Sequence, residues 1–85
     1  MASDEDKRKA QELVDEASEL LKRIDAEPEN KIQLALQVLE LMNDAIALDE
    51  ENDGAWTNRG FAKHALGDHQ AAVNAFDKAI ALNPK

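Results

Sequence analysis

The stretch AWTNRGFAKHALGDHQAAVNAFDKAIALNP, residues 55–84, says most about how this chain folds. It is rich in Ala and Leu, which favour helix, yet two glycines interrupt it. Gly67 precedes Asp68, and this pair is typical of a turn, since Gly can end one helix and Asp can cap the next. Gly60 lies where helix is expected, although Gly costs about 1 kcal/mol relative to Ala inside a helix. The stretch predicts two helices joined at Gly67 and leaves the reason for Gly60 open.

Two further helices are predicted upstream. The first runs from about Asp4 to Asp25, with Ser3 as a reasonable N-cap, and has one apolar stripe: Ala10, Leu13, Val14, Ala17, Leu20, Leu21 and Ile24. The break AEPEN, residues 26–30, follows, with Pro28 suited to a first helical turn. The second helix ends near Leu48 and has two apolar stripes, so we expect it at the centre of the domain: Ile32, Ala35, Leu39, Met42 and Ile46, then Leu34, Val38, Leu41, Ala45 and Leu48.

The third helix is expected over Ala55–Leu66, with Asp53 as its N-cap, and the fourth to about Leu82. Pro84 prevents much continuation. The pattern predicts an all-α domain, residues 1–85, in which four antiparallel helices form two stacked αα-hairpins.

An internal repeat links the two hairpins. The residues Ala-Ile-Ala-Leu at 45–48 recur at 79–82, a shift of 34 positions, and at that shift Met42 matches Phe76 and Leu39 matches Val73. A period of about 34 residues with two helices in each unit is typical of a helical solenoid.

Residues 53–84 resemble the tetratricopeptide repeat. The resemblance rests on Trp56, Gly60, Gly67, Ala72, Phe76, Ala79 and Pro84 at the family's spacing. Arg59 and Lys63 depart from the pattern, standing where Leu and an aromatic residue are common. The resemblance implies a right-handed helical repeat in which Gly60 lets the two helices approach closely around Trp56 and Phe76.

The first hairpin, residues 4–48, is a looser relative. Leu13 and Ala17 take the places of Trp56 and Gly60 only at a shift of 43, so we predict a repeat-like hairpin with lengthened helices. This half is idealised, rich in Glu, Lys, Leu and Ala, whereas the second half has the less regular composition of a natural repeat. The contrast favours an engineered or designed chain; the alternative is a natural interaction module or a fragment of one.

Composition excludes several classes of function. The net charge of −8 opposes binding to nucleic acid and to anionic membranes, and favours a basic protein or peptide partner. There are no cysteines, no apolar run long enough to span a membrane, and an N-terminus without an apolar signal region. We therefore expect a soluble protein that is cytoplasmic, or recombinant with no native compartment.

No residue pattern indicates catalysis. There is no phosphate-binding glycine loop, and neither serine has a histidine nearby in the sequence. His64 and His69 flank the Gly67 turn, but Zn²⁺ usually takes at least three protein ligands, and Asp68 is better explained as a cap. We predict a non-enzymatic scaffold without metal or cofactor.

Two surfaces are candidates for binding. The family resemblance implies that first helices line a concave face, here with Thr57, Asn58, Phe61 and His64. Asn58 corresponds to an Asn that grips a peptide carboxylate in some members, but the Lys and Arg partners of that clamp have no clear counterparts here. The second surface is the outer side of the fourth helix, where Val73 and Ile80 predict a two-fold homodimer contact, with a monomer as the competing interpretation.

Overall fold

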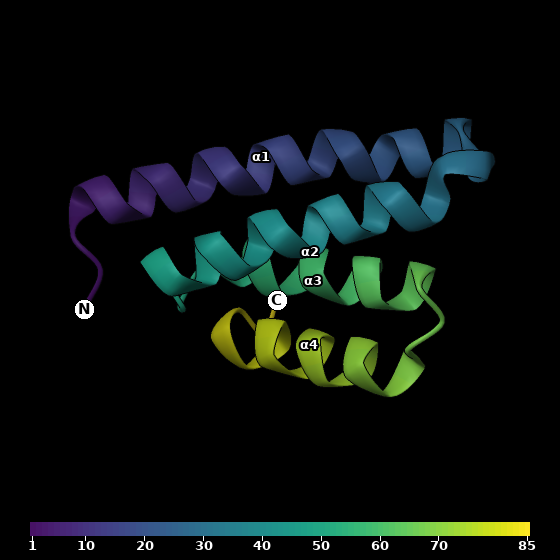
Figure 1. Cartoon of the computed structure of the whole chain (residues 1–85). Helices are drawn as coiled ribbons and strands as arrows, with labels where there is room; N and C mark the ends of the chain where they lie inside the picture. The colour runs from purple at the N-terminus through teal and green to yellow at the C-terminus, as the bar shows by residue number, and fades with distance from the viewer.

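Four α-helices in two antiparallel hairpins make up the structure, a computed structural model that describes residues 1–85. Helix α1 spans Asp4–Ala26 and α2 spans Lys31–Leu48, with a short 3-10 turn, η1, at Pro28–Asn30. Helices α3, Asp53–Ala65, and α4, His69–Leu82, form the second hairpin (Figure 1). The predicted all-α fold of two stacked hairpins is confirmed, and α1 and α2 are longer than α3 and α4.

Side-chain capping contacts mark the starts of α1, α3 and α4. The Ser3 side chain accepts a hydrogen bond from the Asp6 N–H, the Asp6 side chain accepts one from the Ser3 N–H, and Asp68 accepts one from Ala71 at 3.2 Å. The prediction for α3 is wrong by one residue: Asn52 caps this helix by accepting from the Ala55 N–H, and Asp53 is its first helical residue. Both Asn and Asp are common helix caps, so residue type alone does not distinguish Asn52 from Asp53.

The Gly67 turn joins α3 to α4 as predicted. Gly67 is the one residue with positive φ, at 83°, a conformation that glycine adopts without steric penalty. The Asp68 N–H donates to the Lys63 carbonyl at 2.9 Å, and the Gly67 N–H donates to the His64 carbonyl at 3.0 Å. These bonds satisfy carbonyl groups at the end of α3 and fix the direction in which α4 returns.

The turn between α1 and α2 is held by side chains instead. Arg23 donates to Glu27 at 2.9 Å, and Asn30 donates to the same carboxylate at 3.0 Å. These hydrogen bonds, that from Arg23 first, lower the pKa of Glu27 below its ordinary value. Pro28 opens η1 directly after Glu27, in the position expected from the sequence.

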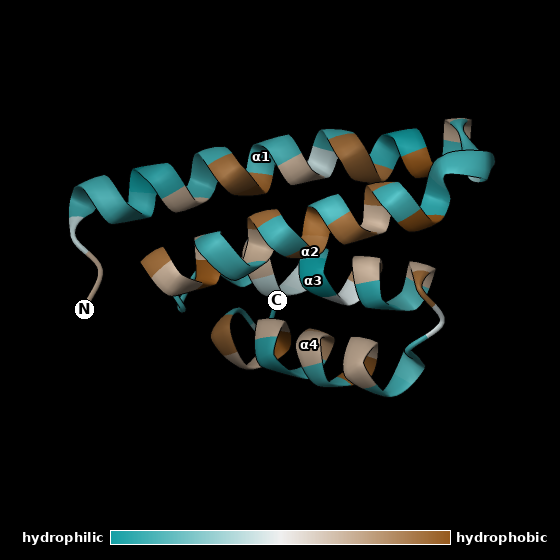
Figure 2. Cartoon of the chain, in the orientation of Figure 1, coloured by the Kyte–Doolittle hydropathy of each residue, from teal (hydrophilic) through white to brown (hydrophobic).

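Helix α2 lies at the centre of the domain, as its two apolar stripes predict. It packs against α1 on one side and α3 on the other, and its buried side chains are Leu34, Ala35, Val38, Met42 and Ala45. Figure 2 shows the hydrophobic segments of α1 turned towards α2, with hydrophilic residues along its outer side. Ile32 belongs to one of these stripes but is 53% exposed, so that stripe is not buried along its whole length.

Polar contacts tie the second hairpin to the first. Arg59, which departs from the family pattern, donates to Asn43 of α2 at 2.6 Å. The Trp56 indole donates to the Glu50 carbonyl at 2.8 Å and so anchors the loop between α2 and α3. Helix α4 packs on α3 alone and forms the edge of the molecule opposite α1 (Figure 1).

Candidate protein-interaction surface

An open groove runs between α1 and α3, the first helices of the two hairpins. Its volume is about 330 Å³, and its lining is mostly apolar: Leu21, Lys22, Ile24, Asp25, Phe61, His64 and Ala65. Phe61 is the largest side chain there and is 50% exposed. A half-exposed aromatic ring beside aliphatic side chains can accept an apolar group from another molecule.

Gly60 and Phe76 together determine how Phe61 is held. The Phe76 ring lies directly on the Gly60 backbone, since a Cβ atom at Gly60 would fall 2.5 Å from Phe76 Cε1. Phe76 also packs edge-to-face against Phe61, with ring centroids 5.3 Å apart. The close helix approach expected at Gly60 is therefore present, and it places the supporting ring behind Phe61.

The predicted concave-face residues divide into two sets. Phe61 and His64 line the groove, whereas Thr57 and Asn58 do not. Thr57 is half-buried, and its hydroxyl donates to the Asp53 carbonyl within α3. The polar side-chain groups of these two residues are engaged within the protein.

Asn58 is buried between the hairpins. It is 7% exposed, and its side-chain amide donates to the Val14 carbonyl and to the Ser18 hydroxyl, each at 3.1 Å. The Ser18 hydroxyl in turn donates to the Val14 carbonyl at 3.0 Å. Asn58 thus cross-links α3 to α1 and is not free to grip a carboxylate.

Helix α1 contributes four residues to the groove that the sequence pattern did not indicate as binding residues: Leu21, Lys22, Ile24 and Asp25. Leu21 and Ile24 pack against the core and also form one wall of the groove. The sequence alignment of the first helices indicates two of these residues, because the shift of 43 places Leu21 opposite His64 and Lys22 opposite Ala65.

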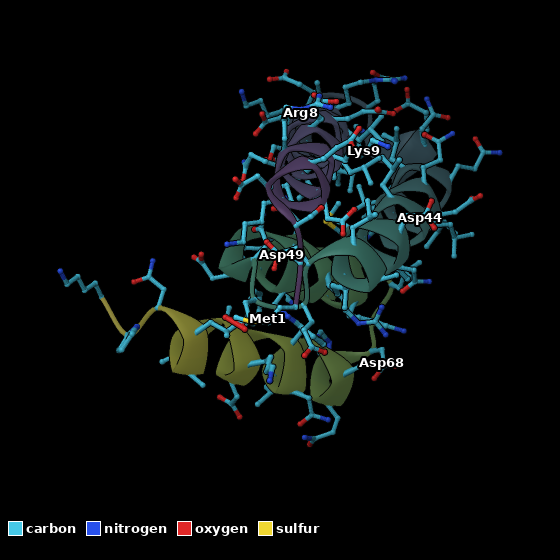
Figure 3. The ribbon with its side chains drawn as sticks, turned by 90° about the vertical axis from the view of Figure 1, so that its left-hand side faces the viewer. Met1, Arg8, Lys9, Asp44, Asp49 and Asp68 are labelled. Carbon is cyan, nitrogen blue, oxygen red and sulfur yellow. The ribbon has the colours of Figure 1, made fainter.

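Charge is distributed unequally between the hairpins. Residues 1–52 hold 15 acidic and 6 basic side chains, a net charge of −9, whereas residues 53–85 hold 3 acidic and 4 basic ones, a net charge of +1. Figure 3 shows Arg8 and Lys9 among the side chains that project outward from α1. The groove lies at the border between the acidic hairpin and the nearly neutral one.

The outer side of α4 presents a second apolar surface. Val73 is 50% exposed and Ile80 is 59% exposed. At the shift of 34 they correspond to Leu39 and Ile46 of α2, which are half-buried against the core. The same positions are therefore covered in the first hairpin and uncovered in the second.

The structure brings the two histidines of the turn together. Their Nδ1 atoms lie 3.2 Å apart, and both rings are exposed. The chain has no group of three or more His, Cys, Asp or Glu residues placed to hold a metal ion, and no helix is long and apolar enough to cross a membrane.

The second hairpin matches a known protein family. The tetratricopeptide repeat family model matches residues 54–85, within one residue of the range in which the sequence pattern was recognised. No curated protein and no solved structure matches the chain significantly.

Proposed function

We propose that this protein binds a peptide segment in the groove between α1 and α3, because residues 54–85 match the tetratricopeptide repeat, a helical repeat that mediates protein–protein interactions. The observation that supports this proposal is Phe61, which is half-exposed in a mostly apolar groove rather than packed in the core. Its role is that of a non-enzymatic interaction scaffold.

The proposed ligand is a segment with a large apolar side chain flanked by lysine or arginine. The apolar side chain packs on Phe61 between Leu21 and Ile24. Fully burying a Phe side chain stabilises by about 1.5–3 kcal/mol, so covering its exposed half contributes roughly 0.7–1.5 kcal/mol. The flanking basic residues are favoured by the net charge of −9 on residues 1–52.

A random peptide library displayed on phage tests the specificity of the groove. We expect selection on the intact protein to enrich peptides with Leu, Ile, Phe or Trp next to Lys or Arg. Binding of a selected peptide should shift the NMR signals of Leu21, Ile24, Phe61 and Ala65. Enrichment of acidic peptides, or shifts confined to other surfaces, would contradict the proposal.

Two residues with equal exposure provide matched variants. Phe61 and Val73 are each 50% exposed, but Val73 lies on the opposite helix of the hairpin. Phe61→Ser should lower the affinity for the selected peptide about tenfold, which corresponds to about 1.4 kcal/mol. Val73→Ser should leave this affinity unchanged. Equal losses for both variants would show that the peptide does not use this groove.

Self-association through α4 is a second candidate, supported by the exposed Val73 and Ile80. The proposed occupant of this surface is the α4 helix of a second copy. The charges of Asp77 and Lys78 cancel, and α4 has no other Asp, Glu, Lys or Arg side chain. Two copies of this helix can therefore approach each other with little electrostatic repulsion. A two-fold contact here also keeps the two acidic first hairpins at opposite ends of the dimer.

Light scattering between micromolar and several hundred micromolar protein tests this second candidate. We expect the mass to rise from one chain towards two, and Ile80→Glu to abolish the rise. Ile32→Glu is the matched control, since Ile32 is 53% exposed but lies on α2. A mass of one chain at every concentration contradicts self-association without affecting the groove.

A further inference from the structure

We propose that His64 and His69 form a binding site for a divalent late transition-metal ion, of which Cu²⁺ is the best suited. The two imidazoles are the only side chains whose ring nitrogens face each other at short range, with Nδ1 atoms 3.2 Å apart. The metal proposal does not rest on the peptide proposal, although His64 also lines the groove.

The distance between the two nitrogens fits coordination of one ion by both. With metal–nitrogen bonds of about 2.0–2.1 Å, a separation of 3.2 Å corresponds to an N–metal–N angle of about 100–105°. This angle lies between the 90° of a tetragonal site and the 109° of a tetrahedral site. The ion would occupy a position between the rings, whose centroids are 5.1 Å apart.

The backbone holds this geometry without the ion. His64 lies in the last turn of α3 and His69 is the first residue of α4. Between them Gly67 adopts its left-handed conformation, and the Asp68 N–H donates to the Lys63 carbonyl at 2.9 Å. Both ligands therefore project from helix ends joined by a fixed turn, which reduces the entropy lost on binding.

Without a metal ion, the contact between the two Nδ1 atoms requires a different position of the proton on each ring. Two neutral imidazoles can share an Nδ1···Nδ1 hydrogen bond only if one ring carries its proton on Nδ1 and the other presents a lone pair. When the ion binds, both Nδ1 atoms supply lone pairs, and the first ring moves its proton through solvent to its own Nε2. One N–H bond is broken and one is formed, the two Nδ1 atoms displace two water molecules from the hydrated ion, and the ion replaces the proton between the rings.

The number and type of ligands select the class of metal. Imidazole nitrogen suits Cu²⁺, Ni²⁺ and Zn²⁺, whereas Mg²⁺ and Ca²⁺ prefer oxygen. Affinity at a given nitrogen site rises towards Cu²⁺ in the first-row series, and Zn²⁺ usually has at least three protein ligands. With only two protein ligands, water fills the remaining coordination positions.

The test is a titration of the full chain with Cu²⁺ at pH 7.5 in a buffer that does not bind metal. We expect one equivalent to bind with a paramagnetic resonance spectrum typical of two imidazole nitrogens. His64→Gln and His69→Gln should each weaken this binding by at least tenfold. Unchanged binding in either variant overturns the proposal, since a background site such as the amino terminus then accounts for the metal.

A relocated histidine tests whether the geometry matters. The variant His69→Gln/Gln70→His keeps two histidines but turns the second imidazole about 100° around α4. We expect it to bind Cu²⁺ as weakly as His69→Gln alone. Affinity equal to that of the original chain would show that any two nearby histidines suffice, and ¹⁵N signals indicating Nε2 rather than Nδ1 ligation of Zn²⁺ would likewise overturn the assigned geometry.

Discussion

Substitution of Gly60 tests the packing arrangement on which the second hairpin depends. In Gly60→Ala the new Cβ atom would lie 2.5, 2.6 and 2.8 Å from Cε1, Cδ1 and Cζ of Phe76. Carbon atoms in favourable contact are about 3.5–4.0 Å apart, so the ring must move by about 1 Å. Phe61 lies against this ring in edge-to-face contact, so the movement also disturbs the aromatic pair.

Two opposing terms set the size of the effect. Alanine gains about 1 kcal/mol of helix propensity over glycine, and overpacking costs about 1–3 kcal/mol. We expect Gly60→Ala to lower the free energy of unfolding by about 1 kcal/mol, which corresponds to about 4–8 °C in Tm for a domain of this size. Urea unfolding followed by circular dichroism measures the change, with the fluorescence of Trp56 as a second probe.

A double-mutant cycle with Phe76→Ala provides the decisive control. Without the Phe76 ring the Cβ at position 60 has no clash, so Gly60→Ala should now raise the free energy of unfolding by about 1 kcal/mol. The sign of the effect should therefore reverse, with a coupling energy of about 2 kcal/mol. If Gly60→Ala stabilises both backgrounds by the same amount, the glycine is incidental and the packing argument is wrong.

Three further predictions concern the links between elements. Asn58→Asp should destabilise by about 2–3 kcal/mol in urea unfolding, more than Asn58→Ala, because it places a carboxylate without donor groups against the Val14 carbonyl; equal effects would argue against this bond. Gly67→Ala should lower stability by about 1–2 kcal/mol, because φ of 83° is strained for any side chain although the site is open, and a neutral result would mean that the turn relaxes. Glu27 has a lowered pKa when folded, mainly through its hydrogen bond from Arg23, so its contribution is present above its ordinary pKa and is lost as the pH falls through the lowered value. The fall in urea midpoint from pH 7 to pH 3 should thus be smaller in Glu27→Gln, and an identical fall would contradict this linkage.

Features decided by contacts over a few residues could be read from the sequence. The Ser3 and Asp68 caps and the Gly67 turn involve groups at most five residues apart, so residue type and spacing suffice to predict them. The cap of α3 was misplaced by one residue because Asn52 and Asp53 are chemically alike. The helices and their pairing followed from the spacing of apolar residues, since each stripe must be buried against a neighbour.

The candidate groove depended on contacts between residues far apart in the chain. Asn58 reaches Val14 across 44 positions, and the turn of α3 that buries Asn58 also leaves Phe61 and His64 facing Leu21 and Ile24. Sequence periodicity gives the faces of one helix but not the angle and rotation at which two helices meet, which depend on the fit of all side chains in the interface. The sequence by itself therefore determined the helices, their ends and their pairing, while only the tertiary structure decided that Asn58 is an internal link, that α1 supplies a wall of the groove, and that His64 and His69 direct their nitrogens at each other.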